Sequence, residues 1–280
     1  MSARYGVIGW PVAHSRSPLI HNYWLHQAGI DAVYEAVAVP PEADFRAKLE
    51  ELRAQGFAGV NVTIPHKEAA FAAVDTHDAV AARLGAVNTI MLAGEKISGH
   101  NTDGRGFIDS LSATRDWASG PALVLGAGGA ARAIVGALLD AGISDIRVSN
   151  RTRARAEAVA ALADAPENSG AVRVFDWEAR AQAAEGATLL VNTTSLGMEG
   201  APTLDMNLDT LAAKATIADI VYVPLETDLL ARAKACGHTP VNGLGMLVHQ
   251  AAHAFDLWFG RRPAFDSALR DRLMRDLGET

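Results

Sequence analysis

A glycine cluster near the middle of the chain is the pattern whose chemistry is clearest. An apolar run at residues 122–125 leads into Gly126-x-Gly128-x-x-Ala131, and a helical pattern then continues to Gly142. A strand–turn–helix unit of this kind lets backbone N–H groups approach a pyrophosphate at the helix N-terminus. The glycines alone would be weak evidence, but between two strand patterns they predict a dinucleotide site.

Arginines follow the second strand of this unit, where NAD-binding proteins usually carry an acidic residue. The chain reads Asn150-Arg151-Thr152, with Arg153 and Arg155 just beyond. A carboxylate would repel a 2′-phosphate, whereas guanidinium groups hold one by charge-assisted hydrogen bonds. The alternative is a solvated helix start that happens to be basic. We predict NADP(H) as the cofactor.

The segment Ser15-Arg16-Ser17-Pro18 lies between a strand end and a helix start. Two hydroxyl groups beside the free N–H groups of a helix terminus could hold a small carboxylate or phosphate. Ser17 could instead be an ordinary N-cap.

Further polar residues stand where α/β sheets bind their ligands. Asn61 and Thr63 alternate on one face of a predicted strand, and Lys67 follows just past its end. A lone Lys is more often solvated. Asn88 lies in an apolar strand pattern and needs a buried partner or a ligand. Asp103 begins a helix pattern, where it could be no more than an N-cap.

Histidine and cysteine do not indicate a metal site. His21, His249 and His253 lie on helical patterns without an evident third ligand, and Cys236 is the only cysteine. The sequence therefore predicts no metal, and it permits no internal disulfide.

The elements that must position these residues alternate between helix and strand. In the first part of the chain we expect helices over 18–28, 41–55 and 104–115, strands over 33–39 and 59–64, and either a hairpin or two consecutive strands over 87–92 and 96–99. Strands at 122–125, 172–175, 188–192 and 216–220 then indicate a doubly wound sheet. Residues 164–170 read as a surface loop.

Two amphipathic helices, at 245–259 and 266–277, close the chain without a strand of their own. We expect them to pack on the first domain and so to make it discontinuous. The predicted fold is α/β with two domains and a cleft between them. Residues 1–103 plus 243–280 form a βα substrate domain, and residues 104–242 form a Rossmann-type NADP-binding domain.

Composition narrows the class of protein. The 280 residues suffice for two domains, and a formal net charge of −7 argues against nucleic acid or an anionic membrane as partner. Neither a signal peptide nor an apolar run of membrane-spanning length is evident. We expect a cytoplasmic protein that acts on a small molecule.

Taken together, these segments resemble shikimate dehydrogenase along nearly the whole chain. The motifs are GWPVAHSRSPLIHN at 9–22, GVNVTIPHK at 59–67, GAVNT at 85–89, NTDG at 101–104, GAGGAARA at 126–133, NRT at 150–152, DIVYVPLET at 219–227 and NGLGMLVHQAAHAF at 242–255. Each motif is modest alone, but their order and spacing are very specific. Two positions depart from the family pattern: Val223 stands where many members have Asn, and His66 stands where many have Phe.

The resemblance implies a role for each matching residue. Lys67 and Asp103 would be the catalytic pair at the carbon that is oxidised, although the sequence leaves open which of them carries the proton. The substrate would be bound at its carboxylate by Ser15, Ser17 and Tyr222, and at its ring hydroxyls by Asn61, Thr63, Asn88 and Gln250. The cofactor would contact Gly126, Ala127, Gly128, Gly129 and Ala130 with its pyrophosphate, Asn150, Arg151, Thr152 and Arg155 with its 2′-phosphate, and Ile220 and Gly243 with its nicotinamide.

The activity that the resemblance implies is the reversible, NADPH-dependent reduction of 3-dehydroshikimate to shikimate, in the pathway to chorismate and the aromatic amino acids. One alternative is an NAD-preferring quinate/shikimate dehydrogenase, against which the basic segment 150–155 argues. A non-catalytic NADP-binding sensor is another, against which Lys67 and Asp103 argue. The sequence does not distinguish a monomer from a homodimer.

Overall fold

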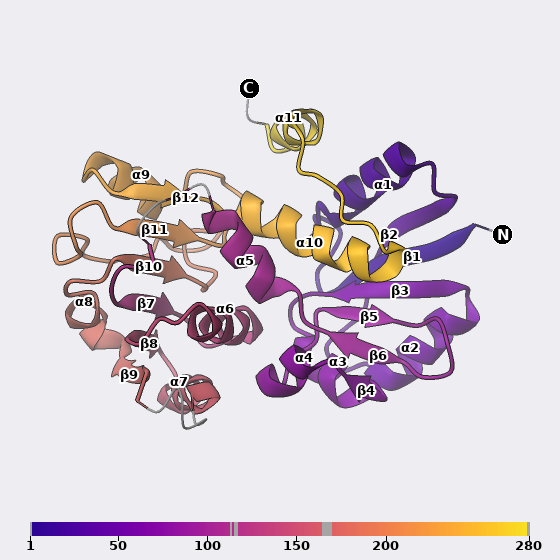
Figure 1. Cartoon of the computed structure of the whole chain (residues 1–280), viewed down its shortest axis with the longest axis horizontal. Helices are drawn as coiled ribbons and strands as arrows, with labels where there is room; N and C mark the ends of the chain where they lie inside the picture. Colours follow the sequence, from indigo (N-terminus) through magenta and orange to yellow (C-terminus); the bar gives the residue numbers. More distant parts are fainter. Residues whose placement is uncertain (1, 113, 115–116, 164–169, 279–280) are drawn as a thin grey trace. The chain divides into compact units, whose positions relative to one another are not determined.

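The computed structural model describes residues 2–112, 114, 117–163 and 170–278. The chain divides into two compact units, one of Met1–Gly106 with Val248–Thr280 and the other of Phe107–Leu247 (Figure 1). The predicted loop at 164–170 and the end of the predicted helix at 104–115 lie largely outside the described residues.

The first unit is built on a mixed sheet with the strand order β2-β1-β3-β5-β6-β4. Its strands are β1 (Ala3–Gly9), β2 (Ala32–Ala38), β3 (Phe57–Val62), β4 (Thr76–His77), β5 (Thr89–Met91) and β6 (Ser98–His100). β1 pairs in parallel with β2 and β3, whereas β5 runs antiparallel to β3 and β6. Of the two arrangements expected for residues 87–99, the structure has the hairpin, formed by β5 and β6.

Helices cover both faces of this sheet. They are α1 (Ser17–Ala28), α2 (Phe45–Ala54), α3 (Lys67–Ala73), α4 (Ala79–Leu84) and α11 (Ser267–Asp276), with parts of α5 (Asp103–Leu111) and α10 (Gly243–Phe259). Figure 1 shows α2, α3 and α4 gathered on one side, where their apolar residues pack with β3 and β5 in one buried cluster. On the other side, aromatic rings of α1, β2 and α10 pack together, including His21, Tyr34 and Trp258.

Two helix starts differ from the prediction. The helix expected from residue 41 begins at Phe45, because Asp44 is extended and its carboxylate caps the helix by accepting a hydrogen bond from Ala47 N at 3.0 Å. Ser17 is the first residue of α1 and not its N-cap. Arg16 occupies the N-cap position without a side-chain cap bond.

The C-terminal helices pack on the first unit. Trp24 Nε1 donates to the carbonyl of Ala264 at 3.1 Å, and Trp258 Nε1 donates to that of Ile90 at 3.2 Å. The indole of Trp258 fills the space where a Cβ on Gly59 would stand. The residues at the end of the chain thus complete the core formed at its beginning.

The second unit is a parallel sheet with the strand order β12-β11-β10-β7-β8-β9 (Figure 1). Its strands are β7 (Ala122–Leu125), β8 (Ile146–Asn150), β9 (Val172–Asp176), β10 (Leu189–Asn192), β11 (Thr216–Asp219) and β12 (Thr239–Val241). The helices α6 (Gly129–Asp140), α7 (Arg153–Ala160), α8 (Arg180–Ala183) and α9 (Asp228–Ala235) connect them. This order confirms the predicted doubly wound fold, although the sequence pattern missed β12, which is short and contains a proline.

The strand order of the second unit reverses between β7 and β10, which lie side by side. Ligands of doubly wound sheets bind beyond the carboxyl ends of the strands at such a point. Here those ends lead to Gly126 and Thr193, so this edge is where a cofactor is expected. Among the helices that the structure describes, none has both the length and the apolar character needed to cross a membrane.

Candidate active site

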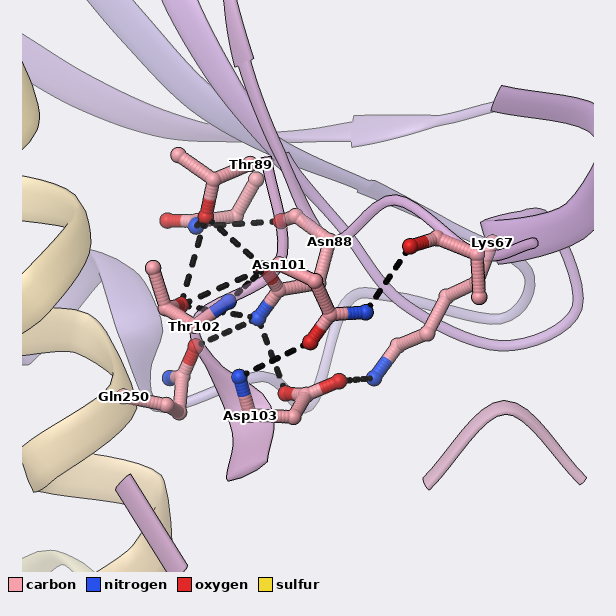
Figure 2. Close-up of polar contacts among 9 residues, drawn as sticks. Lys67, Asn88, Thr89, Asn101, Thr102, Asp103 and Gln250 are labelled. Carbon is pink, nitrogen blue, oxygen red and sulfur yellow. Dashed lines mark hydrogen bonds and ion pairs between the residues drawn. The ribbon is translucent and has the colours of Figure 1, made fainter. Parts of the chain in front are cut away.

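A largely buried ion pair joins the first residue of α3, Lys67, to the first residue of α5, Asp103 (Figure 2). Lys67 Nζ lies 2.5 Å from Asp103 Oδ2, and the two side chains are 14% and 5% exposed. Lys67 follows β3 by the segment 63–66, and Asp103 is the first residue of α5 and not its N-cap. Such low exposure is unusual for a Lys side chain, which normally remains solvated.

Asn88 connects this pair to the rest of the site. Its Nδ2 donates to Asp103 Oδ1 at 2.8 Å and lies 3.4 Å from Gln250 Oε1, while its Oδ1 accepts from Thr102 N at 2.8 Å (Figure 2). The amide therefore has the buried partners that its place in an apolar strand required. It holds the carboxylate of Asp103 in one orientation.

Gln250 reaches this network because α5 and α10 approach closely. A Cβ on Gly106 would collide with the backbone of Gln250. Asn101 orients the start of α5, since its Oδ1 accepts from Asp103 N at 3.1 Å and its Nδ2 donates to the carbonyl of Ala86 at 2.9 Å. No role was predicted for Asn101, Thr102 or Gly106, although NTDG was among the motifs.

Asn61 is held from two sides. Its Oδ1 accepts from the hydroxyl of Tyr34 at 2.7 Å, and its Nδ2 donates to Thr89 Oγ1 at 3.0 Å. Burial raises the pKa of Tyr34 well above its usual value, although a hydrogen bond with Ser17 acts in the opposite direction. His21 stacks on Tyr34 with ring centroids 4.1 Å apart, and burial lowers its pKa to about 3, so that it stays neutral.

Ser15 and Thr63 lie on neighbouring segments of the first unit. Ser15 Oγ accepts a hydrogen bond from Ser17 N at 3.3 Å, which places both serines at the start of α1. Thr63 N donates to the carbonyl of Ile8 at 2.8 Å, so Thr63 stands at the carboxyl end of β1 as well as of β3. Both segments therefore follow the carboxyl ends of strands in this sheet.

The second unit contains a pocket of about 170 Å³ at the carboxyl ends of β7, β8 and β10. Its wall is formed by Gly126, Ala127, Gly128, Asn150, Arg151, Trp177, Thr193, Thr194, Ser195 and Leu196. Gly126 has a φ of +109°, and a Cβ there would collide with Thr193 Oγ1. The predicted residues Gly129 and Ala130 begin α6, whose free N–H groups follow the glycines.

The arginines after β8 differ in what they contact. Arg153 forms ion pairs with Glu157 at 2.9 Å and Asp176 at 2.7 Å. Within the described part of the chain, Arg151 and Arg155 form no ion pair, and both are exposed. Of these three, Arg151 lines the pocket. The side chain of Asn150 is turned back, since Nδ2 donates to the carbonyl of Thr152 at 2.9 Å.

A buried carboxyl orders the loops beside this pocket. Asp219 accepts hydrogen bonds from Thr227 Oγ1 at 2.8 Å, Asn192 Nδ2 at 3.0 Å and Val221 N at 3.1 Å. Burial raises its pKa to about 6, although these three bonds act in the opposite direction. The network joins the end of β10 to the segment that carries Ile220 and Tyr222.

Gly243, the first residue of α10, touches the same segment. Gly243 N donates to the carbonyl of Val221 at 3.1 Å, and a Cβ on Gly243 would collide with the carbonyl of Ile220. The structure thus brings Ile220 and Gly243 together.

Among the described residues, no group of three or more His, Cys, Asp or Glu side chains is arranged to hold a metal ion.

Part of the pocket wall was not predicted from the sequence. Trp177 follows β9, and the segment Thr193–Leu196 follows β10. The sequence NTTSLG after a predicted strand was a usable signal, because polar residues after a strand of an α/β sheet commonly line its site.

Family models match most of the chain. The shikimate dehydrogenase substrate binding domain matches residues 7–90, the shikimate / quinate 5-dehydrogenase model matches residues 110–190, and the shikimate 5'-dehydrogenase C-terminal domain matches residues 243–270. The first match lies within the first unit and the second within the second unit, whereas the third begins at residue 243 and continues into the C-terminal segment of the first unit.

Known proteins resemble the chain over almost its full length. The shikimate dehydrogenase (NADP(+)) of Paramagnetospirillum magneticum is 51% identical over 269 residues, 95% of each chain. The Thermus thermophilus shikimate 5-dehydrogenase, solved with NADP(H) and shikimate, is 40% identical with a TM-score of 0.85, covering 98% of this chain and 99% of that one. A quinate dehydrogenase from Corynebacterium glutamicum, solved with NAD, is 30% identical with a TM-score of 0.87, covering 98% of this chain and 99% of that one.

Proposed function

The chain belongs to the shikimate dehydrogenase family, and we propose that it catalyses the reversible, NADPH-dependent reduction of 3-dehydroshikimate to shikimate. The observation that carries this proposal is the buried pair of Lys67 and Asp103, held by Asn88. Such a pair has the composition needed to move a proton at a ring oxygen. It lies among the amides and hydroxyls that the proposed substrate, a polyhydroxylated acid, requires.

In this assignment NADPH supplies the hydride when it is bound. Lys67 donates a proton from Nζ to the ketone oxygen, where negative charge develops as the carbonyl carbon is reduced. In the reverse direction Nζ accepts the hydroxyl proton. Asp103 keeps the ammonium in place by their 2.5 Å contact.

The remaining polar residues bind and orient the substrate. We assign the carboxylate to Ser15 and Ser17, with Tyr222, because neutral donors at the start of α1 suit an anion. We assign the ring hydroxyls to a set of amide and hydroxyl groups, namely Asn61, Thr63, Asn88 and Gln250. Asn61 accepts a hydrogen bond from Tyr34 and donates one to Thr89. These two bonds fix the direction of its side-chain amide.

The second unit fits NADP. The positive φ of Gly126 and the closeness of Thr193 leave no place for a side chain at this position. A loop whose backbone approaches a pyrophosphate requires such a glycine. The exposed guanidinium groups of Arg151 and Arg155 suit a 2′-phosphate. We assign the pyrophosphate to residues 126–130, the 2′-phosphate to Asn150, Arg151, Thr152 and Arg155, and the nicotinamide surroundings to Ile220 and Gly243.

The competing assignment is an NAD-preferring quinate/shikimate dehydrogenase. The fold does not separate the two, since the quinate dehydrogenase solved with NAD superposes as well as the shikimate enzyme. The arginines after β8 favour NADP, and the Ser15–Ser17 segment favours shikimate. Quinate has a tetrahedral carbon with an added hydroxyl next to its carboxylate, and leaving this hydroxyl unpaired would cost about 1–3 kcal/mol.

Steady-state kinetics with purified protein tests the assignment. We expect turnover of shikimate with NADP, followed by absorbance of the reduced nicotinamide, and kcat/KM for shikimate roughly tenfold or more above that for quinate. Absence of turnover with every combination of substrate and cofactor would favour a non-catalytic NADP sensor. Comparable values for shikimate and quinate would favour the broader dehydrogenase.

A biosynthetic reduction draws on the cellular NADPH pool, so we place this activity in the cytoplasm. The assigned residues all come from one chain, so a monomer would suffice and a homodimer is compatible. Light scattering on the purified protein distinguishes these two states.

A further inference from the structure

The cofactor pocket of the second unit has a wall that the assigned phosphate contacts do not use. On one side lie the backbone of residues 126–128 and the polar residues Asn150 and Arg151. The rest of the wall includes Trp177 and Leu196, both of which also pack against the buried apolar cluster of this unit. Among the described residues that line the pocket, Trp177 alone carries an aromatic ring.

Strand pairing explains why Trp177 lies beside the arginine. β8 and β9 are parallel, and Asn150 at the end of β8 is paired with Asp176 at the end of β9. Arg151 directly follows β8 and Trp177 directly follows β9, so the two residues leave the sheet side by side. A ligand whose phosphate contacts Arg151 has its neighbouring groups close to the indole.

The indole is held in place by the residue that starts α8. Arg180 Nη1 donates to the carbonyl of Trp177 at 2.8 Å, and its guanidinium carbon lies 4.9 Å from the centroid of the indole ring. A cation at this distance from an aromatic ring attracts it. The ring is thus fixed before a ligand arrives, which reduces the entropy lost on binding.

We propose that Trp177 is the platform on which the adenine ring of the cofactor packs. This inference rests on the proposed use of NADP. The dinucleotide presents three groups at this edge of the sheet, which are a pyrophosphate, a 2′-phosphate and a flat aromatic base. The glycine loop suits the first and Arg151 the second. An indole with a Leu beside it suits the third, because bases stack on aromatic side chains through their π faces.

The proposal separates Trp177 from Arg151 in a measurable way. NADP and NAD share the adenine, whereas NADP alone has the 2′-phosphate. Loss of the indole must therefore weaken both cofactors by the same factor, and loss of the Arg151 guanidinium must weaken NADP selectively.

Calorimetric titration of the full chain with 2′,5′-ADP and with 5′-ADP tests this inference. Trp177→Leu keeps an apolar side chain and should raise both dissociation constants by about tenfold. Trp177→Phe keeps a flat ring and should stay close to the wild type. Trp10→Ala, which removes a half-exposed Trp of the first unit, is the control and should change neither value.

Three outcomes would overturn the inference. They are unchanged binding in Trp177→Leu, a loss confined to 2′,5′-ADP, and equal losses in the Leu and Phe variants. If the wild type bound 2′,5′-ADP normally in these cases, the proposed use of NADP would stand. If the wild type bound neither nucleotide, both proposals would fall together. Circular dichroism of each variant verifies that it is folded.

Discussion

Lys67 and Asp103 form an ion pair with little exposure of either side chain to water. Removing one charge of such a pair leaves the other without compensation. Asn88 adds a hydrogen bond to the carboxylate, so that the ammonium faces one fixed oxygen, Asp103 Oδ2. The site therefore contains a proton donor with a defined position, which is the property that acid–base catalysis requires.

Lys67→Ala should reduce kcat for shikimate oxidation by about 10²–10⁴-fold, with little change in KM for shikimate. The physical reason is that the variant lacks the group that exchanges the proton, while the amides and hydroxyls remain. Steady-state kinetics checks this, with Lys48→Ala as the control, since Lys48 pairs with Glu51 on the exposed side of α2. Near-normal kcat with a raised KM would reassign Lys67 to substrate binding.

Arg151→Ala should raise KM for NADP roughly ten- to a hundredfold and leave the use of NAD nearly unchanged, because it removes charged hydrogen bonds to the 2′-phosphate. Arg153→Ala is a matched control two residues away, since that guanidinium is already paired with Glu157 and Asp176. Equal losses with both cofactors in Arg151→Ala would contradict its assigned role.

Among the helices and strands, close packing at glycine positions determines which side chains come into contact. Gly106 lets α5 and α10 approach until Gln250 reaches Asn88, and Gly59 makes room for Trp258. In the second unit, Asp219 joins the end of β10 to the start of α9 by accepting bonds from Asn192 and Thr227. These contacts position the loops that carry the site.

The Asp219 network should make stability depend on pH. The pKa of this carboxyl is about 6 in the folded protein, against about 3.9 for a free Asp. The folded state then binds the proton more tightly than the unfolded chain. The free energy of unfolding falls as pH rises from about 4 to about 6, by about 3 kcal/mol in all.

Asp219→Asn should remove this dependence, because the amide has no charge to bury. The free energy of unfolding of the variant minus that of the wild type should therefore increase between about pH 4 and pH 7. Urea unfolding at a series of pH values measures this difference, with Asp31→Asn as an exposed control. A difference that did not change with pH would contradict the raised pKa.

At the scale of the whole molecule, the two proposed binding functions lie largely in different compact units. Lys67, Asp103, Asn88 and Gln250 are bonded within the first unit, and the pocket lined by Arg151 lies wholly in the second. Each unit has its own sheet and its own buried apolar cluster. Each can therefore respond to a ligand of its own.

Hydrogen exchange should report this separation. NADP alone should slow exchange at residues 126–130 and 193–196, because these segments line or adjoin the pocket that we assign to it, with less effect at residues 61–67 and 88. Shikimate alone should protect the latter segments. Mass spectrometry of peptides after labelling measures both patterns. Protection of the 126–130 loop by shikimate alone would contradict the assignment of the two sites.

Local sequence patterns were enough to predict the doubly wound unit, the strands near residues 87–99 and the polar residues at strand ends. The reason is that strand and helix periodicity, glycines at a tight turn and charge after a strand are local properties. Arg151 after β8 is an example, because its meaning depends only on its position in one β-α-β unit.

Which of these residues contact one another became known from the three-dimensional structure. The pair of Lys67 and Asp103, the contact of Asn88 with Gln250, and Trp177 beside Arg151 all join residues distant in the chain. Helix 41–55 began four residues late, and Ser17 was not an N-cap, because one capping side chain or turn decides such ends. Contacts of this kind arise from strand order and from close approaches at glycine, and a linear pattern of polar and apolar residues does not specify either.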